Sequence, residues 1–172
     1  MKKLFLLFFI VFICNSCDDG EITLESFNFS DATITKCNDE AKTFLYKVKD
    51  QELLLLDISD EVYTHDSSQT TFPYTKTYDI TGTTSAIYRI YDDNLPETFI
   101  CNSIAPASPI VTNEWSATGG TLQVTTSERF DTTNTNLLGY TFTIKLLNIN
   151  FSNANNSFSF EEYLFGNYQT SN

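Results

Sequence analysis

Four cysteines are the side chains of this sequence best suited to chemistry, and they are Cys14, Cys17, Cys37 and Cys101. A thiol can be acylated, can join a second thiol in a disulfide, or can bind a metal ion as the thiolate. Cys14 and Cys17 end an apolar run, whereas Cys37 and Cys101 lie far apart in a polar body. The two pairs therefore predict different chemistry.

The first sixteen residues have the layout of a secretory signal. Two lysines precede ten unbroken apolar residues, Leu4 to Ile13, and the small residue Ser16 stands just before Cys17. Ten helical residues span about 15 Å, roughly half of a hydrocarbon core, so residues 1–16 are expected to be removed as a signal peptide. An open alternative is an ordinary secretory signal, cleaved near Ser16, that leaves Cys17 as a free thiol.

The stretch "CNSCDDG" resembles a bacterial lipoprotein signal, with Cys14 to Cys17 standing where that family has its lipobox, in the relaxed form found in Bacteroidota. The resemblance implies that the thiol of Cys17 takes a diacylglycerol and that its new α-amino group takes an acyl chain such as palmitate. Two or three buried chains would anchor the protein durably, since one chain alone holds only marginally. No cofactor is expected beside this lipid.

Asp18 and Asp19, followed by Glu21, resemble the acidic export signal of surface lipoproteins of Bacteroidota. The resemblance implies a lipid-anchored protein of the outer membrane that faces the cell exterior, with residues 17–21 as its tether. By the enterobacterial sorting rule, an aspartate after the lipidated cysteine would instead retain the protein at the inner membrane. A further alternative is that the acids only solvate the tether.

The mature chain is strongly acidic. Loss of residues 1–16 removes two of the ten Lys and Arg residues and none of the 22 Asp and Glu residues, so 8 basic residues remain against 22 acidic ones, a formal charge of −14. Such a charge repels nucleic acid, which is therefore not expected as a partner. The 156 residues left after 1–16 suffice for one domain, expected over residues 22–172.

Cys37 and Cys101 are the cysteines that remain once Cys14 leaves and Cys17 is lipidated. An even pair in an oxidising compartment predicts a disulfide. It would close a loop of about 64 residues and stabilise the fold by roughly 4 kcal/mol on the chain-entropy model. The alternative is two buried, unpaired thiols.

No catalytic centre or metal site is predicted. His65 is the only histidine, and the residues around it lack the Gly-x-Ser-x-Gly turn of a serine hydrolase, so His65 is expected in an exposed loop. Glu161 and Glu162 are adjacent in a predicted strand and would therefore point to opposite faces of the sheet. In that arrangement the two carboxylates cannot act on one glycosidic bond. The acids of "LDISDE" and "YDDNLPE" lack the spacing of a calcium loop.

Two candidate sites concern sugars. "FDTT" at residues 130–133 resembles an O-glycosylation motif of Bacteroidota, which would place a glycan on Thr132, and the alternative is a polar loop between strands. Tyr88, Tyr91 and Trp115 are candidate binding aromatics, because exposed rings stack on sugar faces. Aromatic residues on strands are more often part of a core.

Strands are the elements that must position these residues. Thr, Phe and Tyr are abundant, a period of two recurs, and no sustained period of 3.6 is found, which predicts an all-β protein. Strands about a dozen residues apart favour an antiparallel β-sandwich of about 8–10 short strands with one inter-strand disulfide. The expected strands are 22–29, 32–35, 43–48, 52–58, 71–80, 85–91, 97–101, 110–115, 120–128, 138–151 and 157–165.

Two features within these strands are ambiguous. "QELLLLDI" could open a short helix, because four consecutive leucines do not settle the period. In "LGYTFTIKLLNINF" the apolar residues change parity at Leu146–Leu147, which predicts a bulge or a strand that crosses between sheets. Gly119–Gly120 is expected to be a turn.

The body also resembles a group of uncharacterised lipoproteins of Bacteroidota. The matching features are Cys37, "YRIY" at 88–91, "CNSIAPASP" at 101–109 and "TGGTLQVTT" at 118–126, in this order. The resemblance implies a shared fold and cellular address and no known activity.

Together these features favour a non-catalytic lipoprotein of the cell envelope that binds a glycan or an envelope protein. One alternative is a small secreted hydrolase that uses surface carboxylates. Another is an accessory subunit of an outer-membrane uptake complex.

Overall fold

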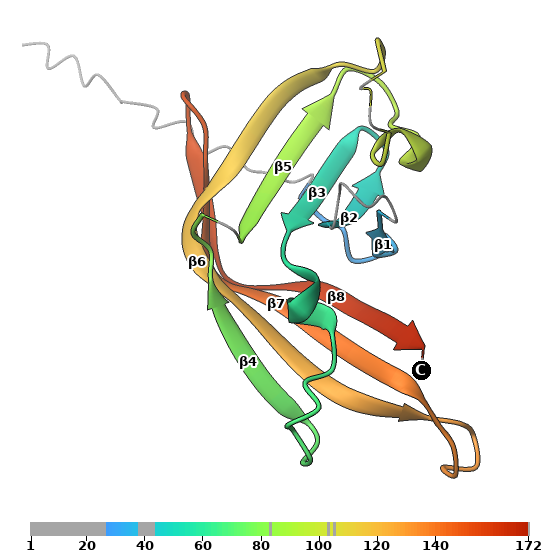
Figure 1. Cartoon of the computed structure of the whole chain (residues 1–172). Helices are drawn as coiled ribbons and strands as arrows, with labels where there is room; N and C mark the ends of the chain where they lie inside the picture. The colour runs from blue at the N-terminus through green and yellow to red at the C-terminus, as the bar shows by residue number, and fades with distance from the viewer. Residues whose placement is uncertain (1–26, 38–43, 83, 103, 105, 172) are drawn as a thin grey trace, which may run out of the picture.

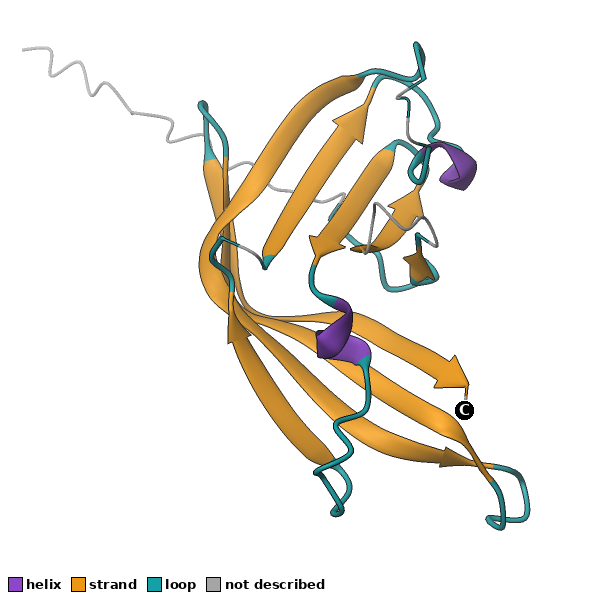
Figure 2. Ribbon diagram, viewed as in Figure 1, coloured by secondary structure: helices purple, strands orange, loops and turns teal. Residues whose placement is uncertain are grey.

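The computed structural model describes residues 27–37, 44–82, 84–102, 104 and 106–171. Within them nearly all regular structure is antiparallel β-sheet, so the all-β prediction is confirmed (Figure 1). Two short 3-10 helices lie outside the sheet, η1 (Asp60–Tyr63) and η2 (Glu97–Phe99) (Figure 2). The strands are β1 (Thr35–Lys36), β2 (Phe44–Lys49), β3 (Glu52–Asp57), β4 (Tyr74–Asp79), β5 (Ser85–Tyr91), β6 (Val111–Phe130), β7 (Leu137–Ser152) and β8 (Ser157–Ser171).

The strands form one eight-stranded sheet in the order β1-β2-β3-β5-β6-β7-β8, with β4 also paired to β6. β5 pairs with residues 111–116 of β6, and β4 pairs with residues 121–126 of the same strand. The long strands β6, β7 and β8 thus run through two halves of the sheet, an upper half with β1, β2, β3 and β5 and a lower half with β4 (Figure 1). In place of the two separate sheets expected of a sandwich, the structure has one bent sheet with two halves. Strands β6, β7 and β8 are long, with 20, 16 and 15 residues, where short strands were expected.

The bend lies where β6 and β7 change register. Gly120 in β6 has a φ of 125° and Asn148 in β7 a φ of 48°. Pairing skips from Gly119↔Asn150 to Thr121↔Leu147, which is the bulge predicted from the parity switch in β7. The expected turn at Gly119–Gly120 is wrong, because β6 continues through the pair as a strand.

The parity switch keeps apolar side chains on the inside of the bend. Before the bulge Phe142, Ile144 and Leu146 are fully buried, and after it Ile149 and Phe151 are. Without the extra residue the second group would face outward. The bulge therefore lets one strand line the core in both halves.

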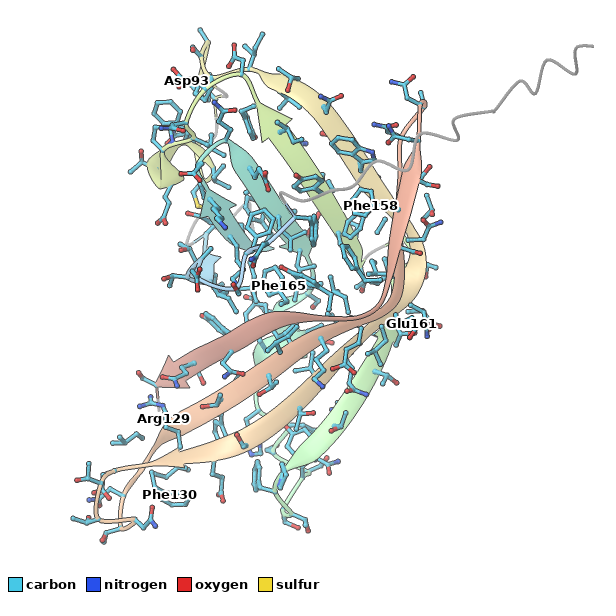
Figure 3. The ribbon with its side chains drawn as sticks, turned by 180° about the vertical axis from the view of Figure 1, so that it is seen from behind. Asp93, Arg129, Phe130, Phe158, Glu161 and Phe165 are labelled. Atoms are coloured by element: carbon cyan, nitrogen blue, oxygen red, sulfur yellow. A yellow bond between two sulfur atoms is a disulfide. The ribbon has the colours of Figure 1, made fainter. Side chains whose placement is uncertain are left out.

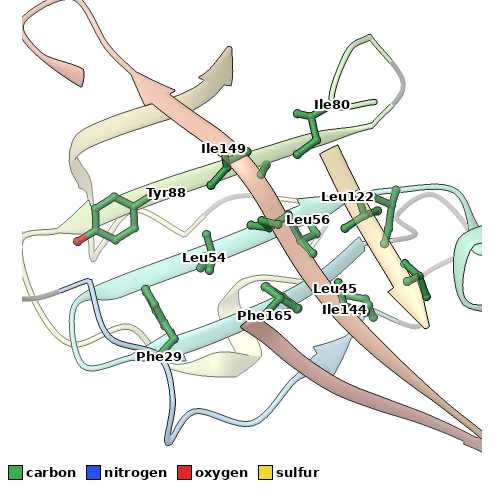
Figure 4. Packing of buried hydrophobic residues seen from close by; sticks show 14 of the residues in the cluster. Phe29, Leu45, Leu54, Leu56, Ile80, Tyr88, Leu122, Ile144, Ile149 and Phe165 are labelled. Carbon is green, nitrogen blue, oxygen red and sulfur yellow. The ribbon is translucent and has the colours of Figure 1, made fainter. Parts of the chain in front are cut away.

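The main core fills the space enclosed by the bend (Figure 4). Leu54 and Leu56 of β3 point into it from the upper half, and Leu122 of β6 points into it from the lower half. Burial of a leucine side chain contributes about 1.5–3 kcal/mol. Phe27 packs on this core with its ring 4.8 Å from that of Phe160 and 4.9 Å from that of Tyr88, measured between centroids.

β3 is buried on both faces. Leu54 and Leu56 enter the main core, while Leu53 and Leu55 enter a second cluster on the outer face of the upper half. Apolar residues at both parities are expected of a strand covered on both sides, so the four leucines form a strand and not a helix.

The outer face of the upper half is covered by residues 92–102 and 106–110, the cover segment. Residues Glu97–Cys101 were expected to form a strand, and this is wrong because η2 occupies Glu97–Phe99. Pro96 precedes η2 with a φ of −66°, the value to which its ring is limited, and its carbonyl accepts a bond from the Phe99 amide at 2.9 Å. The segment is thereby turned back over the sheet.

The bend predicts that two neighbouring glycines differ in their tolerance of a side chain. A Cβ at Gly120 would lie 2.9 Å from the Cα of Ile149 and 3.0 Å from two backbone carbonyl oxygens, whereas a Cβ at Gly119 would meet nothing within 4 Å. Gly120→Ala should therefore lower the free energy of unfolding by about 2 kcal/mol or more, and Gly119→Ala should change it by less than about 0.5 kcal/mol. Urea unfolding measures both. Equal effects of the two substitutions would contradict this account of the bend.

Candidate functional site

A cavity of about 550 Å³ lies between the outer face of the upper half and the cover segment. Leu53, Leu55 and Ile87 form its floor on β3 and β5, and Leu95, Phe99 and Ile100 belong to the cover segment above them. The complete lining is Phe44, Leu53, Leu55, Asp57, Ile87, Arg89, Tyr91, Leu95, Phe99, Ile100, Asn102, Pro106, Pro109, Ile110 and Val111. This size falls within the range of small-molecule sites, roughly 300–1,000 Å³.

A disulfide fixes the middle of the cover segment. Cys37, directly after β1, is bonded to Cys101, two residues after the end of η2, with their Cα atoms 5.4 Å apart. The predicted pairing is confirmed, and the alternative of two unpaired thiols is wrong. The hydroxyl of Tyr46 beneath donates to the carbonyl of Glu97 at 3.2 Å.

Hydrogen bonds fix both ends of the cover segment. The amide of Leu95 donates to the carbonyl of Asp50 at 2.8 Å, at the turn between β2 and β3. The amide of Asp92 donates to the carbonyl of Ile110 at 3.1 Å, and the amide of Ile110 donates to the carboxylate of Asp92 at 2.9 Å. The acids of "YDDNLPE" thus build the turn at the start of the cover.

Arg89 is the cation of the cavity lining. It lies opposite Leu53 on β3, and its Nε donates to Oε2 of Glu114 at 2.6 Å. Burial by itself lowers the pKa of Arg89, but the hydrogen bonds and charges of Glu114 and, to a lesser extent, Tyr91 outweigh burial and raise that pKa above its ordinary value. Arg89 therefore remains a cation, and its side chain is 31% exposed.

The lining suits the binding of an apolar ligand better than it suits catalysis. Its described residues include three with charged or amide side chains, Asp57, Arg89 and Asn102, and none of the described lining residues is a histidine, serine or cysteine. A nucleophile with an adjacent base, the arrangement needed for covalent catalysis, is not formed by these three side chains.

His65 lies outside this lining, in the segment that leads to β4. Contrary to the expected exposed position, the ring of His65 is half-buried and stacks on that of Tyr140 with centroids 4.2 Å apart. Asp66 next to it accepts bonds from Lys76 at 2.5 Å and from the hydroxyl of Ser68 at 2.7 Å. These bonds hold the pKa of Asp66 below its usual range. The carboxylate of Asp66 is thus engaged with Lys76 and Ser68. It is not hydrogen-bonded to His65 as the acid of a Ser-His-Asp triad would be.

The other acidic candidates also have structural partners. Asp60 forms an ion pair with Lys36 at 3.4 Å and accepts a hydrogen bond from Tyr63, whose pKa is raised by burial and by this bond. Glu162 pairs with Lys145 at 2.6 Å, and Glu161 is exposed (Figure 3). In the part of the chain that the structure describes, no group of three His, Cys, Asp or Glu side chains could hold a metal ion.

The exposed aromatic platform predicted from Tyr88, Tyr91 and Trp115 is wrong. Tyr88 is 0% exposed and stacks on Trp115 at 5.3 Å inside the main core, because both side chains lie on the inner face of paired strands. The indole Nε1 of Trp115 donates to Asn156 at 2.6 Å. Tyr91 has the opposite parity and lines the cavity, with 8% of its surface exposed.

Thr132 is exposed in the loop between β6 and β7, beyond Phe130 at the tip of the lower half (Figure 3). Asp131 beside it accepts bonds from Thr133, Thr135 and Asn136, which hold the pKa of Asp131 below its usual range. The glycosylation of Thr132 stays a prediction.

Cys17, the predicted site of lipid attachment, lies outside the described residues, and so do Asp18 and Asp19. Among the described residues no helix has the length and apolar character needed to cross a membrane.

The chain was compared with protein-family models, with curated proteins and with solved structures, and none of them matches it. That the chain is a lipoprotein of the Bacteroidota type therefore stays a prediction.

Sequence reasoning missed the cavity. Arg89, Ile110 and Val111 were not singled out, although two signals could have pointed there. One signal is "LLLL" at 53–56, where the side chains that point to either face are apolar, and the other is "YRIY" at 88–91, where all but Arg89 are apolar or aromatic. Such strands are expected to be covered on both faces.

Removal of the disulfide should destabilise the whole domain. In the double variant Cys37→Ala/Cys101→Ala the free energy of unfolding should fall by about 4 kcal/mol, because the unfolded chain loses a constraint across 64 residues. Urea unfolding of oxidised wild type and variant measures the change, and wild type with reductant should match the variant. A fall below about 1 kcal/mol would contradict a stabilising role for the bridge.

Proposed function

We propose that this protein is a non-catalytic lipoprotein of the cell envelope, held in the outer membrane by acyl chains on Cys17, that binds an envelope component in the cavity under the cover segment. The observation that carries the proposal is the cavity itself. A space of about 550 Å³ with a mostly apolar lining lies beneath a cover that the disulfide holds in place.

The lining favours an apolar envelope component over a free glycan. Sugar hydroxyls need hydrogen-bond partners once they leave water, and twelve of the fifteen described lining residues have apolar or aromatic side chains. The aromatic rings expected to stack on a sugar lie mainly in the core.

A binding role is also supported by the engagement of the acids. Asp60, Asp66 and Asp92 each accept bonds that hold a turn or a neighbouring strand. A hydrolase that used surface carboxylates would need a pair of them directed at one space, and among the described residues the cavity lining contains one, Asp57.

Anchoring through Cys17 is tested by detergent-phase partition of membranes from the native cell. Wild-type protein should enter the detergent phase and should carry a diacylglycerol on an N-terminus at Cys17 by intact mass. Cys17→Ser should move to the aqueous phase, because the acyl chains supply the membrane affinity. Cys14→Ser is the matched control and should behave as wild type, since Cys14 leaves with the signal.

Two results would contradict the proposal. One is wild-type protein with a free Cys17 thiol, and the other is a Cys17→Ser protein that stays in the detergent phase.

A further inference from the structure

We infer that the cavity takes a single-chain amphiphile with a carboxylate head, whose hydrocarbon chain lies under the cover segment and whose head replaces Glu114 as the partner of Arg89. The inference deepens the proposed function, on whose binding site it rests.

The walls select a hydrocarbon chain. The floor residues Leu53, Leu55 and Ile87 face the cover residues Leu95 and Phe99 across the cavity, and these side chains carry no polar atoms. Pro106 and Pro109, also in the lining, lack backbone N–H donors. A polar chain would lose its hydration here without replacement, because these walls offer its polar groups no hydrogen-bond partners.

The lining residues at the start of β6 leave apolar surface in water. Ile110 is 56% exposed and Val111 is 42% exposed, and both line the cavity. Exposed apolar residues beside an apolar cavity are typical of ligand entrances. Leu164, which is 54% exposed on β8, does not line the cavity and provides a matched control.

Arg89 selects the head. The guanidinium is a fork of five N–H donors that matches a carboxylate, and Glu114 takes the donor on Nε. Glu114 is 43% exposed, so it can turn to water when another carboxylate arrives. Until then it keeps Arg89 paired, because a half-buried cation without a partner is costly.

Asp57 orients the ligand. On β3 it lies opposite Ser85, whereas Leu53 lies opposite Arg89, so the acid of Asp57 is four residue pairs along the strand from the Arg89 position. A carboxylate head is repelled from the Asp57 end and attracted to the Arg89 end. The two charges therefore orient the ligand with its head at Arg89 and its hydrocarbon chain extending toward Asp57.

The test is calorimetric titration of the mature chain, residues 17–172, carrying Cys17→Ser, which keeps every described residue and avoids detergent. The probes are decanoate, decanol and decyltrimethylammonium, which share one hydrocarbon chain and differ in the charge of the head. Decanoate should bind about tenfold more tightly than decanol, since a charged hydrogen-bonded pair is worth about 1.5 kcal/mol or more. Decyltrimethylammonium should bind least.

Two substitutions at the ion pair should act in opposite directions. Arg89→Gln should weaken decanoate binding about tenfold and leave decanol within about twofold, because only the head contacts Arg89. Glu114→Gln should strengthen decanoate binding, because it removes the competing carboxylate. Lys145→Gln and Glu162→Gln, in the matched pair on β7 and β8, should change neither.

A further pair of variants tests the entrance. Ile110→Glu should weaken both decanoate and decanol, and Leu164→Glu, a residue of similar exposure, should weaken neither.

Three results would overturn the inference. They are equal affinity for decanoate and decanol, tighter binding of the cationic probe, or weakening by both Arg89→Gln and Glu114→Gln. Each would leave the anchoring test at Cys17 unaffected, because detergent-phase partition does not depend on the cavity.

Discussion

The close approach of β6 and β7 at Gly120 is the constraint on which the rest of the structure depends. A side chain there would collide with the backbone of Ile149, and the positive φ of Asn148 completes the bulge on the facing strand. With this bend, three long strands line the core in both halves of one sheet. Without it, β6 to β8 would form a flat ribbon whose apolar face met water.

The bend covers only one face of the upper half, and the cavity is a consequence. The outer face of β3 and β5 must be buried by something other than the sheet, and the cover segment does this with η2 and three prolines, Pro96, Pro106 and Pro109. A segment so poor in regular structure contributes few backbone hydrogen bonds, so the Cys37–Cys101 bridge holds it to β1. A cover that rests on prolines and a short helix leaves space beneath it, which a regular strand or helix would fill.

Much of the fold followed from residue patterns, and the exceptions have physical causes. The strand at residues 85–91, the bulge after Leu146 and the disulfide were predicted, because each depends on local parity or on cysteine number. Gly119–Gly120 was mistaken for a turn, since glycine also serves where two backbones approach closely. The cavity depends on the path of residues 92–110 over a distant face, which no local pattern encodes. Cys17 lies outside the described residues, so its role depends on sequence alone.

The most direct test of the central claim is methyl NMR of the protein during titration with decanoate. Leu53 and Leu55 face the cavity, while Leu54 and Leu56 on the same strand face the main core. The account predicts chemical-shift changes and methyl-to-decanoate contacts at Leu53, Leu55 and Ile87, with Leu54 and Leu56 unchanged. Contacts at Leu54 or Leu56, or none in the cavity at saturation, would contradict the claim that this outer face is the binding site.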